Sequence, residues 1–501
     1  MPSLTTPPAA VPAADQPPYL PSSVPQTYYI EPYGCQMNFA DADLVNAILQ
    51  ANNFHPVRDT ASADIVLLVT CAIRENAESK IFRRLDALQF LRQNGGKVAL
   101  LGCMAERLKF RLLEGERKVD VICGPDAYRD LPRLLARSKE GGVGNVMLSV
   151  DETYADILPV QIEHNRVSAC VSIMRGCNNM CTYCVVPFTR GQRYSIQMLM
   201  KGKERSRPVE SILREVQHLE TQGIRQITLL GQNVNSYRDT SQNPSIARNS
   251  LSSSDFKPIY KYRTEGLHFV DLLDMVSSAA PKIRFRFTSP HPQFFPLDLL
   301  KLISSRPNIG NQIHLPAQSG SDTVLTRMRR GYTKAAYLSL VDRIRKEIPG
   351  VTLSSDFIVG FCGETEEEFR ETLKLAEEVE YEMAYNFAYS MREKTKAHRT
   401  LLDNVPSEIK KERLMRLNEV YERGRIKKID AMLGRKEVVL VEKKVETGWT
   451  GRSDGNIRVR IEGEIRGERS IEKGDLILAE TYRRQGGTLL SRPISRTILS
   501  S

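Results

Sequence analysis

Apolar runs and amphipathic stretches alternate along the first third of the chain. Three runs have the pattern of strands: TYYIEPYG (27–34), ADIVLLV (63–69) and KVALLG (97–102). The last two are continuously apolar, which is typical of strands buried on both faces. DADLVNAILQAN (41–52) has a helical pattern, and we expect Asp41 to be its cap. The alternation predicts an open parallel α/β sheet domain over residues 27–145.

A second alternation over residues 163–425 contains six candidate strand–helix units. Their strands are VSACVSIM (167–174), RQITLLG (225–231), IRFRFTS (283–289), NQIHLPA (311–317), VTLSSDFIVG (351–360) and MAYNFAYS (383–390). Helical patterns lie between them, such as ETEEEFRETLKLAEEVE (364–380), which carries acidic residues in its first turn. Six units predict a partial (β/α)6 barrel that is open on one side, with its chemistry at the carboxyl ends of the strands.

The pattern changes again after a charged helical run at 408–430. Short strands such as EVVLVE, IRVRIEG and DLILAETY are separated by turns over residues 434–498, which predicts a small β-barrel. We expect Trp449, the only tryptophan, to lie in its core. Two segments, 192–203 and 236–258, interrupt the barrel pattern and are predicted to be inserted loops.

Length and composition indicate several domains but do not identify the binding partner. A chain of 501 residues is too long for one hydrophobic core. Its net charge of +11 suits a polyanionic partner and equally suits an ordinary basic surface. No apolar run is long enough for a membrane span, so we expect no membrane partner. Residues 1–26 are proline-rich and predicted to be a disordered leader; the absence of Lys and Arg before Arg58 argues against a secretory or transit peptide.

Three cysteines occupy equivalent places in the first domain. Cys35, Cys71 and Cys103 each lie just past the end of a predicted strand. The carboxyl ends of parallel strands share one edge of a sheet, where ligands bind. We therefore expect these three thiols to converge, although a lone cysteine is usually a small core residue.

Three more cysteines fall within eight residues in MRGCNNMCTYCVVPFTRG, namely Cys177, Cys181 and Cys184. Structural zinc needs four closed ligands, and no histidine follows in this stretch. A redox dithiol would leave one thiol unexplained. Iron–sulfur cubanes normally take one thiolate per iron, so three cysteines would leave one iron open to another ligand.

With Tyr183 before the third cysteine, this motif resembles that of the radical S-adenosylmethionine enzymes. Seven segments in order resemble the MiaB-type methylthiotransferases, and among them the eukaryotic branch: YGCQMN, VTCAIRENAESK, LLGCMAERLK, SIMRGCNNMCTYCVVPFTRG, LLGQNVNSY, IHLPAQSGSD and DFIVGFCGET. The C-terminal barrel, with GRSDGN (451–456), is similar to the TRAM domain of that family. The resemblance covers residues 27–498.

The resemblance implies two [4Fe-4S] clusters. Cys177, Cys181 and Cys184 would hold the cluster that binds S-adenosyl-L-methionine, and Cys35, Cys71 and Cys103 would hold the second. Tyr183, Gln232 and Asn233 match positions near the cofactor. The remaining thiols match no ligand position and are predicted to be buried: Cys123, Cys170 and Cys362.

The resemblance also implies a reaction and partners. Members of the family add a methylthio group to C2 of an isopentenylated adenosine at position 37 of tRNA. An aromatic C–H offers no acidic proton, so general base catalysis would not suffice and a radical route is expected. The cofactor carries that radical chemistry. The expected partners are tRNA, a flavodoxin- or ferredoxin-like electron donor and a sulfur source. We expect the basic C-terminal barrel to bind the RNA backbone.

Several alternatives stay open at this point. Relatives run almost directly from TRG into an ERSRP-like stretch, so the segment 192–203 is a departure beside the cofactor site. The substrate could instead be threonylcarbamoyl-adenosine. The protein could also be a regulatory binder of a kinase activator with structural clusters, an association that the eukaryotic branch carries in its name, or a non-catalytic RNA-binding protein. The resemblance favours the mitochondrion, whereas the leader leaves the cytoplasm open.

Overall fold

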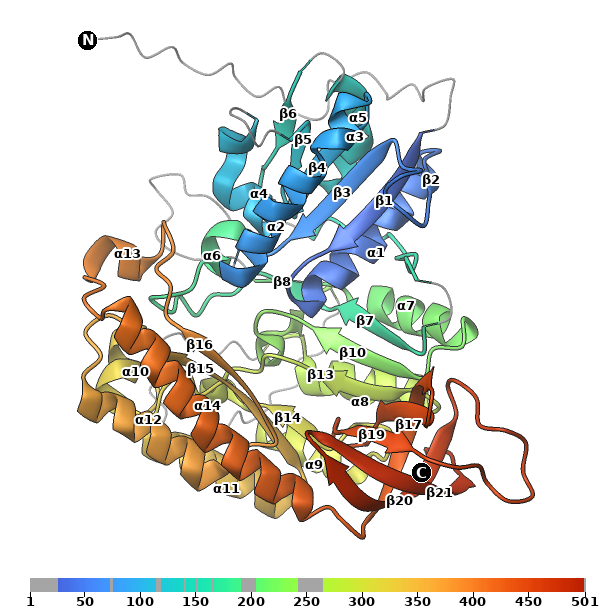
Figure 1. The fold of residues 1–501 in the computed structure, drawn as a ribbon, viewed down its shortest axis with the longest axis vertical. Helices are drawn as coiled ribbons and strands as arrows, with labels where there is room; N and C mark the ends of the chain where they lie inside the picture. The colour runs from blue at the N-terminus through green and yellow to red at the C-terminus, as the bar shows by residue number, and fades with distance from the viewer. Residues whose placement is uncertain are drawn as a thin grey trace.

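The structure is a computed structural model that describes residues 26–72, 75–113, 119–138, 141–149, 152–163, 166–190, 204–241 and 265–499. Three α/β or β units follow one another along the chain, from the blue N-terminal sheet to the red C-terminal barrel (Figure 1). The predicted leader up to residue 25, the segment 192–203 and most of the loop 236–258 lie outside the described residues.

A six-stranded, all-parallel sheet forms the N-terminal unit, with the strand order β2-β1-β3-β4-β5-β6. The strands are β1 (Thr27–Pro32), β2 (His55–Pro56), β3 (Ile65–Thr70), β4 (Lys97–Gly102), β5 (Val121–Cys123) and β6 (Val143–Asn145). The helices are α1 (Gln36–Ala51), α2 (Glu75–Ala87), α3 (Gln89–Gln93), α4 (Cys103–Leu108) and α5 (Leu131–Arg137). The predicted parallel sheet is confirmed, and β2, β5 and β6, each of two or three residues, are additions that the pattern did not indicate.

Both faces of this sheet are buried, which explains its continuous apolar runs. Ile65, Leu67 and Val69 of β3 pack with α1 and α5 on one face. Val66 and Leu68 pack with α2 and α4 on the other face. Successive strand residues point to opposite sides, so a strand covered by helices on both sides is apolar at every position.

Six parallel strands form the central unit in chain order. They are β7 (Ser168–Ser172), β10 (Gln226–Leu230), β13 (Arg284–Phe287), β14 (Gln312–His314), β15 (Thr352–Val359) and β16 (Met383–Ala388). The order is β7-β10-β13 and then β14-β15-β16, and a parallel bridge between Phe285 and Ile309 joins the two halves. The larger helices are α7 (Val209–Thr221), α8 (Phe269–Ala279), α9 (Leu297–Ser305), α10 (Asp322–Met328), α11 (Lys334–Glu347) and α12 (Glu366–Val379). Since β7 and β16 are not paired with each other, the predicted open barrel is confirmed.

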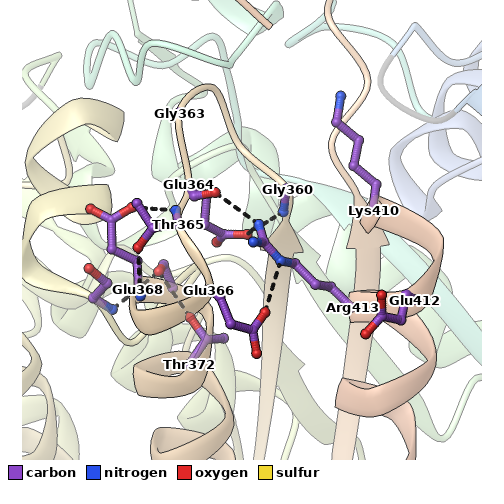
Figure 2. A network of polar contacts seen from close by, with 12 residues as sticks. Gly360, Gly363, Glu364, Thr365, Glu366, Glu368, Thr372, Lys410, Glu412 and Arg413 are labelled. Atoms are coloured by element: carbon purple, nitrogen blue, oxygen red, sulfur yellow. Dashed lines mark hydrogen bonds and ion pairs between the residues drawn. The ribbon is translucent and has the colours of Figure 1, made fainter. Parts of the chain in front are cut away.

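The long helix α14 (Ser407–Asp430) packs against α12 and β16 at the end of the open barrel (Figure 1). Its polar residues also hold the loop after β15. Arg413 Nη1 donates to the Glu364 carbonyl and to Glu364 Oε2 at 3.0 Å each, and Gly360 N–H donates to the same carboxylate at 2.6 Å (Figure 2). Helix α14 therefore fixes the loop after β15 at the carboxyl end of the barrel.

The C-terminal unit is a closed barrel with the order β17-β18-β19-β21-β20. Its strands are β17 (Lys436–Val445), β18 (Gly448–Arg452), β19 (Arg458–Ile461), β20 (Leu476–Gln485) and β21 (Thr488–Arg496). Closure removes the free edges that a small sheet would otherwise expose. Trp449 is only half-buried at the margin of the core, with Lys444 over its ring, so its predicted core position is wrong.

This barrel is attached to the amino ends of the central strands. Arg286 on β13 donates to the Ser453 and Asp454 carbonyls at 2.8 Å each, and Thr352 at the start of β15 donates to the Gly455 carbonyl at 2.6 Å. The Asp454 carboxylate accepts from the Asn311 backbone N–H at 3.1 Å. The GRSDGN turn is thus the joint between the two barrels, at the end opposite to the carboxyl edge of the strands.

The N-terminal unit docks beside β7 through α1. Met37 and Ala40 of α1 form a small apolar cluster with Leu230 of β10, with Cys35 and Cys170 at its edge.

Among the described helices, none has both the length and the apolar character needed to cross a membrane.

Candidate active site

Three neighbouring strands bring the first group of cysteines to one edge of the N-terminal sheet. Cys35 caps the start of α1 after β1, Cys71 directly follows β3, and Cys103 begins α4 directly after β4. A hydrogen bond between the two thiols links Cys35 to Cys71 and lowers the pKa of Cys35 to about 6. Burial raises the pKa of Cys103, which also feels the charge of Cys35. The structure thus places Cys35 and Cys71 in contact and Cys103 at the same edge of the sheet, and a joint role of the three thiols as ligands stays a prediction.

The backbone at Gly34 lies tightly against this group. Gly34 has a φ of +112°, and a Cβ there would lie 2.5 Å from the Cβ of Cys71. A side chain at position 34 would be strained by this backbone conformation and would also collide with Cys71. The glycine in YGC therefore allows the end of β1 to approach the end of β3.

The other three cysteines, Cys177, Cys181 and Cys184, lie on a loop between β8 (Met174–Arg175) and the short helix α6 (Val186–Thr189). Burial raises the pKa of Cys177 and raises that of Cys184 to about 12, and the neighbouring thiols add to both shifts. Thiols bind metals only as thiolates, so a positively charged group must stabilise the deprotonated form here. An iron–sulfur cluster bound by all three would provide that charge.

The geometry of the thiols bears on the kind of metal centre. Within the described ranges, no three Cys, His, Asp or Glu side chains are close enough together to hold a single metal ion. In a cubane each thiolate binds a different iron, so its ligands surround the cluster instead of meeting at one atom. Each group offers three thiols on separate turns of chain, a donor set that fits a [4Fe-4S] cluster with one open iron.

Two buried arginines each contact one cysteine group, and the sequence pattern did not indicate either. Arg190 Nε donates to Cys103 Sγ at 3.0 Å, and Arg330 Nη1 donates to Cys181 Sγ at 3.4 Å. The exposed fractions of these residues are only 3% and 4%. Each guanidinium thus presents a buried positive charge to one thiol of one cysteine group. Their partners are distant in sequence, which is why periodicity could not reveal them.

Asp41 holds Arg190 in place and is not the predicted helix cap. Helix α1 begins six residues earlier than expected, with Cys35 and not Asp41 at its cap position, so Asp41 lies inside the helix and is fully buried. Its carboxylate accepts from Arg190 at 2.5 Å and from Arg175 at 2.8 Å. Burial opposes ionisation, but the two arginines outweigh it and keep the pKa of Asp41 below its usual value. The prediction was wrong because a buried ion pair and a cap use the same residue type.

The predicted cofactor residues lie at the loop that carries Cys177, Cys181 and Cys184, in different environments. Gln232 Oε1 accepts from Gly176 N–H at 2.6 Å, so it fixes the start of the loop. Asn233 is buried, and its Nδ2 lies 3.4 Å from Glu204 Oε1. The Tyr183 ring packs edge-on against Phe361, at 6.5 Å between centroids, within a small apolar cluster.

Glu204 is a further site residue that the sequence did not indicate. Its carboxylate accepts from the backbone and side-chain N–H groups of Asn178, and burial raises its pKa. In the part of the chain that the structure describes, no basic side chain pairs with Glu204. The Oδ1 atoms of Asn178 and Asn233 are buried there without a hydrogen-bond donor. Next to Cys177, the described residues therefore bring together the acceptor oxygens of Glu204, Asn178 and Asn233.

The cysteines predicted to be buried thiols have two kinds of environment. Cys123 and Cys362 are buried, whereas Cys170 is only partly buried, so the prediction is wrong for that residue. Cys170 lies at the edge of the cluster that contains Cys35, and burial raises its pKa to about 12.

Comparisons with known proteins cover the same parts of the chain. Residues 171–376 match the Radical SAM superfamily model, and residues 27–124 match the model of the uncharacterized protein family UPF0004. The chain is similar to a protein of Mus musculus named mitochondrial tRNA methylthiotransferase CDK5RAP1, with 49% identity over 90% of this chain and 78% of the relative. A CDK5RAP1-like protein of Oryza sativa is 48% identical over 94% of this chain and 82% of its own length.

A bacterial relative and a solved structure extend this similarity. A protein of Christiangramia forsetii named tRNA-2-methylthio-N(6)-dimethylallyladenosine synthase is 41% identical over 93% of each chain. The radical S-adenosylmethionine methyltransferase TsrM of Kitasatospora setae, solved with cobalamin and a [4Fe-4S] cluster, superposes with a TM-score of 0.50. It covers 74% of this chain and 76% of its own, at 14% identity, and therefore supports the fold alone.

Proposed function

The chain belongs to the family of radical S-adenosylmethionine tRNA methylthiotransferases, and from this premise we propose that it adds a methylthio group to C2 of the N6-dimethylallyl-adenosine at position 37 of tRNA. The observation that supports this most is the pair of three-thiol groups at adjoining carboxyl edges, with a cation beside each. Two such groups suit a reaction that needs one centre to start a radical and another to supply sulfur.

The six cysteines divide between the two centres in this proposal. Cys177, Cys181 and Cys184 would hold the cluster that binds S-adenosylmethionine, and Cys35, Cys71 and Cys103 would hold the second cluster. Reductive cleavage of the bound S-adenosylmethionine would supply a radical able to act on an aromatic C–H bond. The protein's own groups would bind and orient the substrates and exclude water around these centres.

The cofactor's amino-acid end has a matching site on the chain. The α-amino group of S-adenosylmethionine carries N–H donors, and the oxygens of Glu204, Asn178 and Asn233 are acceptors beside Cys177. Buried acceptors without donors are costly, so a ligand that supplies donors is bound favourably. Gln232 would act indirectly through Gly176, and Tyr183 through the packing of the loop.

The C-terminal barrel would bind the RNA. It carries 14 Lys and Arg against 10 Asp and Glu over residues 434–501. On its surface, the exposed Tyr482 has the Arg492 guanidinium 4.9 Å from its ring centre, and Lys443 and Lys444 are exposed as well. Basic side chains contact phosphates without regard to sequence, and an aromatic ring can stack on a base.

Several partners and the compartment are part of the same proposal. We expect an electron donor of the flavodoxin or ferredoxin type, and a separate sulfur source for the second centre. The mouse, human and rat relatives are named mitochondrial, which favours that compartment for this chain. A fluorescent fusion of the full chain would reveal a cytoplasmic pool if one exists.

Two measurements test the reaction. In a host strain that lacks its own methylthiotransferase, the wild-type chain should produce the methylthiolated nucleoside, detected by mass spectrometry of digested tRNA. Cys177→Ala should abolish it, whereas Cys123→Ala, which changes a thiol buried in the N-terminal core, should not. If threonylcarbamoyl-adenosine is methylthiolated instead, that nucleoside is the substrate. Unchanged modification in Cys177→Ala would favour a regulatory or RNA-binding protein.

Iron content tests the ligand assignment separately. After anaerobic reconstitution, the wild type should hold about eight irons per chain, and the triple variant Cys35→Ala, Cys71→Ala, Cys103→Ala about four, counting four per cubane. A wild type with about four irons would remove the second cluster from the proposal.

A further inference from the structure

Arg190 connects the two cysteine groups physically. It lies six residues after Cys184 and immediately after α6, on the segment that leaves the loop of Cys177, Cys181 and Cys184. The same segment packs on the N-terminal unit, since Val185 forms an apolar cluster with Ala72 and Cys103. The guanidinium of Arg190 then reaches Cys103 Sγ at 3.0 Å. A single short segment therefore runs from one group to the other.

The Arg190 side chain is held rigidly at this place. Its Nη2 is 2.5 Å from Asp41 Oδ2, and Asp41 is held in turn by Arg175 at 2.8 Å. Tyr128 OH also donates to Asp41, at 3.2 Å. All of these groups are buried, where charges interact strongly because little water screens them. A buried guanidinium fixed by an ion pair and aimed at a thiol is a permanent feature of that thiol's surroundings.

We propose that Arg190 sets the reduction potential of the second cluster, through its hydrogen bond to Cys103 Sγ and its buried positive charge. The proposal rests on the assignment of Cys35, Cys71 and Cys103 to that cluster. Hydrogen bonds to ligand sulfurs, net charge and burial are the main protein factors that determine iron–sulfur potentials. Arg190 provides the first two at a place where burial makes both effective.

The direction of the effect follows from charge. Reduction adds one electron to the cluster and moves no proton, so the cluster and its ligands gain one negative charge. A nearby positive charge stabilises the reduced state more than the oxidised state, which raises the potential. Asp41 acts in the opposite sense, and its ion pairs with Arg190 and Arg175 leave a net charge of +1 for the three side chains.

The experiment uses the full chain in a background that retains only the second cluster, with Cys177, Cys181 and Cys184 replaced by alanine. The reconstituted protein is titrated with dithionite as the electron donor, and the reduced cluster is followed by electron paramagnetic resonance. Three variants are compared with the parent, namely Arg190→Gln, Arg190→Lys and Asp41→Asn. Arg207→Gln is the matched control, because Arg207 is also buried in an ion pair, 2.6 Å from Glu215, but contacts no cysteine among the described residues.

We expect Arg190→Gln to lower the ratio of reduced to oxidised cluster at a fixed potential about tenfold, equivalent to about 59 mV for one electron. Arg190→Lys should lower it less, because the charge remains while the planar donor is lost. Asp41→Asn should raise the ratio, and Arg207→Gln should leave it unchanged.

The outcomes separate a tuning role from a structural one. If Arg190→Gln and Asp41→Asn retain about four irons but titrate like the parent, Arg190 only ties the units together and the proposal is overturned. An equal change in Arg207→Gln would overturn it too, since a general loosening would then be the cause. If the parent background binds no iron, the cluster assignment fails, and the role of Arg190 fails with it.

Discussion

The carboxylate of Glu204 accepts a hydrogen bond from the backbone N–H of Asn178 and another from its side-chain amide, each at 3.1 Å. Asn178 directly follows Cys177, so the carboxylate is fixed to the cysteine loop itself. Among the described residues, the donors to this carboxylate are neutral amides, and a buried carboxylate with neutral donors alone has no compensating positive charge. This arrangement suits the amino group of S-adenosylmethionine better than it suits a purely structural role.

Glu204→Gln should therefore weaken the binding of S-adenosylmethionine to the reconstituted protein about tenfold, since hydrogen bonds to charged groups contribute about 1.5–3 kcal/mol. The dissociation constant can be measured by equilibrium dialysis. Binding of 5′-methylthioadenosine, which lacks the amino-acid end, should not change. Equal weakening of both ligands would mean that Glu204 shapes the loop and does not meet the amino group. Glu382→Gln offers a matched control, since Glu382 is a buried carboxylate just before β16 that accepts from Leu353 N–H.

Stability should depend on pH through Glu364, the carboxylate that Arg413 and Gly360 hold in Figure 2. Burial raises the pKa of Glu364 to about 7, although Gly360 and Arg413 oppose this. In the unfolded chain the group ionises near pH 4.5, so between about pH 4.5 and 7 the folded state binds more protons. The free energy of unfolding should then fall by about 2–3 kcal/mol as the pH rises through this window.

Glu364→Gln should remove this part of the pH dependence, because the amide mimics the protonated carboxyl at every pH. Denaturant unfolding of the apoprotein at pH 4.5, 6 and 8 measures the effect. Identical slopes for the wild type and the variant would show that the carboxylate is ionised in the folded protein throughout.

The joint between the two barrels should depend on Arg286. Its three nitrogens donate to the Gln226 side chain and to the carbonyls of Ser453 and Asp454, at 2.8–2.9 Å. Arg286→Met should lower the free energy of unfolding by about 3 kcal/mol and should expose the chain between α14 and β17 to proteases. Arg460→Met is the matched control, since Arg460 makes one long contact of 3.3 Å to Gln485 at the surface. Its change should be below about 1 kcal/mol.

RNA binding should depend on the exposed pair of Tyr482 and Arg492. Tyr482→Ala should weaken tRNA binding about tenfold, because stacking of a base on an aromatic ring contributes about 1–3 kcal/mol. Tyr482→Phe keeps the ring and should bind like the wild type. Lys443→Gln should reduce the slope of log affinity against log salt by about one. Fluorescence anisotropy at several salt concentrations measures both effects, and an unchanged Tyr482→Ala would place the RNA on another face.

The sequence predicted what depends on local pattern and missed what depends on distant partners. Continuous apolar runs identified β3 and β4, and residues just past their ends placed Cys71 and Cys103 correctly. In contrast, Asp41 looked like a helix cap because its true partners, Arg175 and Arg190, lie 134 and 149 positions away. Glu204 gave no signal for the same reason, since its burial beside the cysteine loop is visible only in three dimensions. The strands β5 and β6 were missed because three residues are too few to show a period.

The attachment of the C-terminal barrel has a consequence for the shape of a substrate. The turn at Ser453–Gly455 joins the amino ends of the central strands, whereas the cysteine groups lie beyond the carboxyl ends. An RNA held by the small barrel must therefore extend along the whole height of the central barrel before its base reaches the thiols. The small barrel and the cysteine groups lie at opposite ends of the central barrel, and a minimal stem-loop would reach only one of them. A shortened RNA should therefore still bind to the small barrel but should not be methylthiolated. Substrate length would then be a criterion of recognition that is independent of base identity.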